Sequence, residues 1–94
     1  MQSILQDRKE CYVTRRPYPL EEHHIYYGTG KRKISEKYGF KVWLTPEKHR
    51  FANDSVHLDP NRKLDLRLKR ECQAKFEETH SREEFVDLIG KSYL

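Results

Sequence analysis

The order of hydrophobic and polar residues predicts short β-strands in the first half of the chain and two helices in the second half. After Asn61, apolar residues recur every four positions, a spacing that places them on one face of an α-helix. The residues of this stripe are Leu64, Leu68, Cys72 and Phe76. A last short helix is expected from Ser81, where a capping-box pattern begins, to Gly90. Both helices are expected to pack on a smaller β-containing unit.

The strands are predicted where β-branched and aromatic residues cluster. Phe40 to Leu44 is the clearest of these segments, and Leu20 to Tyr27 and Cys11 to Thr14 also have strand character. Between the two main strands, Lys31 to Tyr38 is expected to form a short helix. The first ten residues are polar and lack periodicity, so they are expected to be frayed or to form a short helical turn.

A further helix is predicted to begin at Thr45 and Pro46. Thr45 can act as the N-cap, and Pro46 suits the first helical position because the N–H that proline lacks would be unpaired there. The helix is expected to run to about Ala52 or Asn53. A turn over Asn53-Asp54-Ser55 is expected to follow it.

Composition indicates one small domain, residues 1–94, with a thin core. Only 35% of the residues are hydrophobic while 36% are charged, so a bound metal or a partner chain would help to hold the fold. The formal net charge of +4 does not by itself indicate nucleic acid. Basic residues nevertheless cluster in two places that suit a surface facing phosphates, Arg15-Arg16 and Lys31-Arg32-Lys33.

Cysteine usage and the lack of long apolar segments favour a cytoplasmic protein without a membrane partner. Cys11 and Cys72 are far apart, and no stretch resembles a signal peptide or a membrane span. Both thiols are therefore expected to be free in a reducing compartment.

The histidines carry the most informative chemical pattern. His23 and His24 adjoin each other on a predicted strand, where neighbouring side chains point to opposite faces. His49 lies in the first turn of the helix that starts at Thr45, and His57 follows the turn after that helix. Neutral imidazole is both the commonest metal ligand near neutral pH and the usual general base. Three such ligands would leave coordination positions open for water and a phosphate oxygen.

Two segments, Glu22-His23-His24-Ile25 and Val42 to His49, resemble the motif of HNH, or ββα-metal, nucleases. That motif is a strand ending in a pair of ligating and catalytic residues, a loop, a second strand, and a helix carrying a ligand in its first turn. Thr45-Pro46-x-x-His49 is similar to the corresponding stretch of the DNase colicins. From about residue 11 onward, the chain is similar to small HNH proteins of phages and prophages.

The resemblance implies an α+β fold with a ββα-metal core over about residues 20–58 and two C-terminal helices over about residues 61–90 packed on it. It implies that His23 and His49 bind one divalent metal ion (Mg²⁺, Mn²⁺, Ni²⁺ or Zn²⁺) and that His24 is the general base. For the third ligand, His57 is favoured if the helix ends before it. Asn53, four residues after His49 on the same helical face, is the alternative.

The chain departs from the motif in two respects. No asparagine stands near Phe40, where the motif places the residue that pins the loop between the strands, so we expect bracing from elsewhere, such as contacts around Gly39. Of the four cysteines that bind a structural zinc in many relatives, only Cys11 remains. We therefore expect no structural zinc and interpret Cys11 as a vestige or a small buried residue.

These features together predict a metal-dependent endonuclease that hydrolyses DNA phosphodiester bonds, and the resemblance implies a phage origin. Its expected contacts to DNA phosphates are Arg15, Arg16, Lys31, Arg32 and Lys33, and phage or host DNA-processing proteins are candidate partners. One alternative is a non-catalytic nucleic-acid-binding module in which the histidines hold a structural ion. Another is a helical interaction protein acting through residues 61–94, although an apolar stripe is more often part of the core.

Overall fold

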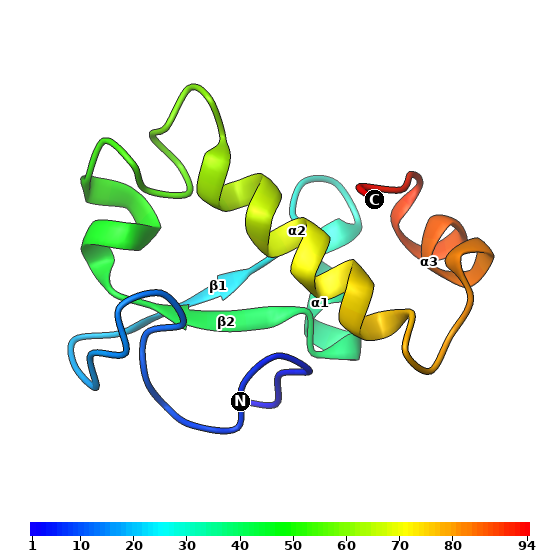
Figure 1. Ribbon diagram of the computed structural model, residues 1–94, viewed down its shortest axis with the longest axis horizontal. Helices are drawn as coiled ribbons and strands as arrows, with labels where there is room; N and C mark the ends of the chain where they lie inside the picture. The colour runs from blue at the N-terminus through cyan, green and yellow to red at the C-terminus, as the bar shows by residue number, and fades with distance from the viewer.

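A two-stranded antiparallel sheet lies at the centre of the α+β fold (Figure 1). The computed structural model describes all 94 residues. Strand β1 (Glu21–His24) pairs with β2 (Lys41–Leu44), and helix α1 (Lys31–Tyr38) lies between them in the chain. The order strand, helix, strand is as predicted, and α1 ends at Gly39 in the left-handed region, with φ of 75°. Strand β1 is shorter than the predicted segment from Leu20 to Tyr27.

The register of the sheet assigns the two adjacent histidines to opposite faces. His23 is paired with Val42, and His24 is paired with Lys41. Residues directly opposite each other in an antiparallel pair share a face of the sheet. His23 therefore lies on the face where Val42 joins the core, whereas His24 lies with Lys41 on the other face.

The helix predicted after Thr45 is present as a single π-helical turn, η1 (Glu47–Phe51). The carbonyl of Thr45 accepts a hydrogen bond from the N–H of His49 at 2.9 Å. Ala52 ends the turn with extended backbone angles. The chain then comes back alongside η1, so that the N–H of His57 donates to the carbonyl of His49 at 3.3 Å.

The two C-terminal helices supply the apolar face that covers the sheet. Helix α2 (Lys63–Phe76) runs across the sheet, and α3 (Arg82–Ile89) packs against α1 (Figure 1). The predicted stripe of α2 is buried, and α3 begins with the predicted capping box at Ser81 and ends at Gly90. No helix in the chain combines the length and the apolar character that crossing a membrane requires.

Aromatic rings join the helices to the sheet. Tyr26, which follows β1, contacts both Phe40 and Phe85 edge-on, with ring centroids 5.4 Å apart in each pair. Phe40 also meets Phe76 of α2 at 5.6 Å. Edge-to-face pairs of this kind add to the stabilisation from burial alone. The core is therefore built around the start of β2, close to where β1 ends.

The first ten residues are not frayed, and they lie along the outer edge of β2 (Figure 1). The N–H of Ile4 donates to the carbonyl of Gly39 at 3.0 Å, and the side-chain oxygen of Gln6 accepts from the N–H of Trp43 at 2.7 Å. The prediction of a frayed or helical segment was wrong. These residues satisfy backbone groups that an edge strand would otherwise leave unpaired.

The segment Cys11 to Thr14, predicted to be a strand, forms a turn instead. The N–H of Arg15 donates to the carbonyl of Cys11 at 2.9 Å, and Arg15 has a left-handed φ of 67°. The N–H of Tyr12 donates to the carbonyl of Trp43 at 2.8 Å, so the turn is anchored to β2. Cys11 is fully buried as a free thiol, in keeping with the interpretation of a small core residue.

A buried serine braces the connection between the strands. The hydroxyl of Ser35 donates to the carbonyl of Tyr26 at 2.6 Å and accepts from the N–H of Tyr26 at 3.1 Å. The N–H of Ile25 donates to the carbonyl of Phe40 at 2.9 Å. Ser35 thus satisfies both backbone groups of a buried residue just beyond β1, and no asparagine is needed near Phe40.

We expect Ser35→Ala to lower the free energy of unfolding by about 2–6 kcal/mol. The substitution leaves the N–H and the carbonyl of Tyr26 buried without a side-chain partner, and each such group costs about 1–3 kcal/mol. Urea unfolding at neutral pH would measure the change. Thr29→Ala, at an exposed position in the same connection, is the control. A loss in Ser35→Ala no larger than in this control would contradict the bracing role.

Candidate metal centre

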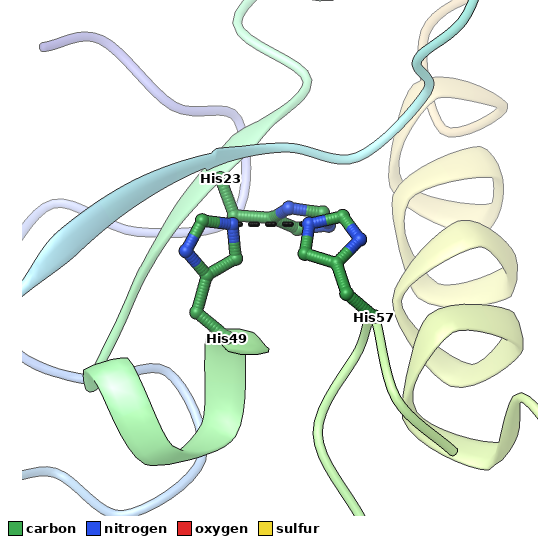
Figure 2. Close-up of side chains that lie close together, drawn as sticks. All are labelled: His23, His49 and His57. Atoms are coloured by element: carbon green, nitrogen blue, oxygen red, sulfur yellow. Dashed lines mark hydrogen bonds between the residues drawn. The ribbon is translucent and has the colours of Figure 1, made fainter. Parts of the chain in front are cut away.

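Three histidines from separate parts of the chain meet at one place. His23 comes from β1, His49 from η1, and His57 from the segment that returns alongside η1. Each ring offers a nitrogen atom that lies within 4.8 Å of the nitrogens offered by the other two. Figure 2 shows the three rings facing one another. The helical turn ends before His57, which is the condition under which His57 was favoured as the third ligand.

His23 is the innermost member of this group. Its side chain is buried, and its Nε2 atom has no hydrogen-bond partner. Burial, and after it the charges of His49 and His57, lower the pKa of His23 to about 3, so the ring is neutral at neutral pH. A buried polar atom without a partner is uncommon and destabilising. A metal ion would give this nitrogen the partner that the protein does not supply.

His49 is oriented by a carboxylate on the same face of β1 as His23. Its Nδ1 atom lies 2.7 Å from Oε1 of Glu21. An ionised carboxylate only accepts hydrogen bonds, so Nδ1 carries the proton and the lone pair of a neutral ring is on Nε2. Arg50 binds both oxygens of Glu21, at 3.0 and 2.7 Å. Its hydrogen bonds, with that of His49, lower the pKa of Glu21 and keep the carboxylate ionised.

His57 completes the group through a close contact between two ring nitrogens. Its Nε2 lies 3.2 Å from Nε2 of His49, as the dashed line in Figure 2 marks. Because Nε2 of His49 is the acceptor, Nε2 of His57 carries the proton between them. Two imidazole nitrogens bound to one tetrahedral ion at about 2.0–2.1 Å would be roughly 3.3 Å apart. The observed spacing therefore fits an ion in place of that proton.

Asn53, the alternative third ligand, is an exposed residue of the turn that follows η1. His23, His49 and His57 by themselves offer three nitrogens within 4.8 Å of one another, without a contribution from Asn53. The donor set that fits an ion thus consists of three imidazoles, which suit borderline metals such as Zn²⁺ and Ni²⁺ better than Mg²⁺.

His24 lies in a different environment, on the opposite face of β1. Its Nε2 atom is 2.8 Å from Oε1 of Glu36 in α1 and 3.6 Å from Oε1 of Glu22. Nζ of Lys41 lies 2.6 Å from the other oxygen of Glu36. The structure therefore does not bring the predicted general base into the three-histidine group. It places His24 in a second cluster of ionisable side chains at the end of the strand.

The predicted DNA-binding residues fall into two sets. Arg32 and Lys33 line a cavity of about 460 Å³ together with His24, Gly30 and Glu36. Lys31 is partly buried at the start of α1. Arg15 and Arg16 are exposed in the loop before β1. Arg16 lines a separate cavity of about 300 Å³, whose other residues include Lys48 of η1. Only the set on α1 is thus adjacent to His24.

A network of polar side chains around the buried Asp65 contacts the three-histidine group from α2, and it was not predicted. The hydroxyl of Tyr27 donates to Asp65 at 3.1 Å, and the Tyr27 ring lies 5.5 Å from that of His57. Asp65 is 1% exposed and accepts hydrogen bonds from Lys69 at 2.8 Å and from Arg62 at 2.7 Å. Buried charges are tolerated when they are paired in this way. Tyr27 thereby links the histidines to α2.

Some of the missed residues had a signal in the sequence and others had none. Glu21 stands two positions before His23, so a strand places both on one face. Asp65 and Lys69 have the spacing of a helical ion pair directly beside the apolar stripe. Glu36 had no such signal, because its contact with His24 depends on how α1 packs on the sheet.

Comparison with known proteins adds no relative: no family model, curated protein or solved structure matches the chain.

We expect the metal-free protein to lose stability as the pH falls from 6.5 toward 3. The unfolded chain binds a proton at His23 near the ordinary pKa of 6.5, whereas the folded chain does so only at about 3. The unfolded state therefore gains about 1.4 kcal/mol per pH unit from this residue across that range. Urea unfolding in the presence of a chelator, at several pH values, would measure the slope.

His23→Gln removes the titrating group. The slope of unfolding free energy against pH should therefore fall by the contribution of one proton, about 1.4 kcal/mol per pH unit. His80→Gln, at an exposed histidine, is the matched control and should keep the slope of the original chain. An unchanged slope in His23→Gln would show that burial does not suppress the protonation of His23.

Proposed function

We propose that this chain is a metal-dependent DNA endonuclease of the HNH type. The observation that carries the proposal is the convergence of His23, His49 and His57, from a strand, a helical turn and the segment after it. The antiparallel pair β1 and β2 followed by η1 has the element order of a ββα-metal core. The segments that resemble the nuclease motif supply two of these histidines, His23 and His49.

In this proposal the three histidines hold one divalent ion. The ion, when bound, acts as a Lewis acid that neutralises negative charge developing on the scissile phosphate. The protein provides the orientation of the ligands: Glu21 keeps the Nε2 lone pair of His49 available, and Arg50 holds Glu21 in place. Burial keeps His23 neutral, the form in which imidazole is a ligand.

His24 is the general base in this proposal and accepts a proton from the attacking water. It is the last residue of β1 and lies beside the cavity lined by Arg32 and Lys33. These two cations would neutralise phosphates flanking the scissile bond. A water activated by His24 would therefore lie near the end of β1, beside that cavity.

A second candidate is a non-catalytic DNA-binding module with a structural metal ion. The observation that favours it is the position of His24, whose Nε2 is bound to Glu36 on the face of β1 opposite His23. In such a module the three histidines would stabilise the fold, and the basic residues of α1 would bind DNA without hydrolysis.

Cleavage of supercoiled plasmid in the presence of Zn²⁺, Ni²⁺, Mn²⁺ or Mg²⁺ separates the two candidates. We expect nicking that depends on the metal and falls about 10²–10⁴-fold in His24→Ala, the contribution typical of a general base. His80→Ala is the matched histidine control and should cleave like the original chain. Metal binding and DNA binding without nicking would support the module and contradict the endonuclease.

Glu21→Ala should weaken metal binding about 10–100-fold, because the substitution removes the carboxylate that orients His49. Titration of the metal-free protein with Co²⁺, followed by its visible absorption, measures the affinity without any cleavage assay. Glu47→Ala, which removes an exposed acid from the same helical turn, is the control. Equal affinities for the two variants would mean that Glu21 does not support the ligand.

A further inference from the structure

The second cluster of ionisable side chains joins α1 to both strands through one carboxylate. Oε1 of Glu36 accepts a hydrogen bond from Nε2 of His24 at 2.8 Å, and Oε2 accepts one from Nζ of Lys41 at 2.6 Å. Lys41 is the cross-strand partner of His24. Glu36 is therefore held at both oxygens, and each of its two partners comes from a different strand.

Hydrogen-bond chemistry determines which nitrogen of His24 carries the proton. Lys41 and His24 lower the pKa of Glu36 to about 2, so its carboxylate is ionised at neutral pH and can only accept. Nε2 of His24 must then be the donor. In the neutral ring the lone pair is on Nδ1, which no protein group contacts through a hydrogen bond. That nitrogen is the one available to accept a proton.

Lys41 distinguishes this cluster from a second metal site. Glu22, His24 and Glu36 lie close enough together to hold a cation. The Lys41 side chain is only 5% exposed, and its ammonium group is 2.6 Å from Glu36 and 3.6 Å from Glu22. The positive charge that these carboxylates require is therefore already present. Glu22 lies 3.6 Å from the His24 ring, beyond hydrogen-bond distance, so Glu36 is the partner that orients it.

We propose that Glu36 is a positioning residue that holds His24 with Nε2 protonated and Nδ1 free, and that Lys41 in turn holds Glu36. This inference rests on the proposed function, in which His24 accepts a proton from water. In a catalytic triad, the third group fixes the orientation of the base and does not touch the reacting atoms. Glu36 has the corresponding role toward His24.

The test is a double-mutant cycle on plasmid nicking by the metal-loaded full chain. We expect Glu36→Ala to lower kcat about 10–100-fold with little change in KM, since it removes the group that orients the base. In the His24→Ala background the same substitution should have no further effect, because Glu36 acts only through His24. Glu36→Gln keeps an acceptor oxygen of the same size and should restore part of the rate. Glu83→Ala, at an exposed acid of α3, is the control.

A second measurement follows the hydrogen bond itself. In the ¹H NMR spectrum of the same protein, the Nε2 proton of His24 should be protected from solvent and shifted downfield, and it should disappear in Glu36→Ala. Thermal unfolding would identify any variant that does not fold. If Glu36→Ala does not fold, the nicking rate and the Nε2 proton signal are measured in Glu36→Gln and Lys41→Met in its place.

The outcomes separate the inference from the function on which it rests. Nicking that is unchanged in His24→Ala overturns the proposed base, whatever Glu36 does. Slow nicking in His24→Ala with an unchanged rate in Glu36→Ala overturns the positioning role alone. An equal loss from Glu36→Ala in both backgrounds also overturns it, because the carboxylate would then act on the fold and not on His24.

Discussion

The register between β1 and β2 is the constraint on which the arrangement of the chemistry depends. It sets His23 opposite Val42 and His24 opposite Lys41, so two adjacent imidazoles are directed to different faces of one short strand. One face brings His23 to His49 and His57, and the other brings His24 to Glu36. A shift of one residue would exchange these environments and place the lone pair of His23 outside the core.

The two faces differ in how their polar groups are satisfied. Around His23 the protein leaves a buried nitrogen without a partner, and the spacing of the neighbouring rings fits an ion. Around His24 the carboxylates of Glu22 and Glu36 have a partner within the protein, because the ammonium group of Lys41 lies close to both. We infer that the first face is suited to binding a metal ion and the second to holding an imidazole in one protonation state. Under the proposed function, these are the two tasks that a metal-dependent nuclease requires.

Support for the three histidines comes from side chains distant in the sequence. Glu21 reaches His49, 28 residues away, and Tyr27 reaches Asp65, 38 residues away. Few hydrophobic residues are available, so the fold also relies on buried polar contacts. Examples are the ion pair of Asp65 with Lys69 and the hydrogen bond from Ser35 to the carbonyl of Tyr26. Such groups are stabilising only while all their partners are in place. The site and the stability of the fold are therefore coupled.

The sequence by itself determined the features that depend on neighbouring residues. The stripe of α2, the capping box at Ser81, the short helix α1 and the helical turn after Thr45 follow from periodicity, capping and backbone preference, which act over a few positions. The three histidines that could hold a metal were also named from the sequence, although their assignment relied on resemblance to a nuclease motif. Only the tertiary structure decided that the first ten residues cover the edge of β2 and that Cys11 to Thr14 turn, because an unpaired strand edge overrides weak local preference. It alone decided the partners of His24 and His49, since contacts across the sheet depend on register and helix packing, which no local pattern encodes.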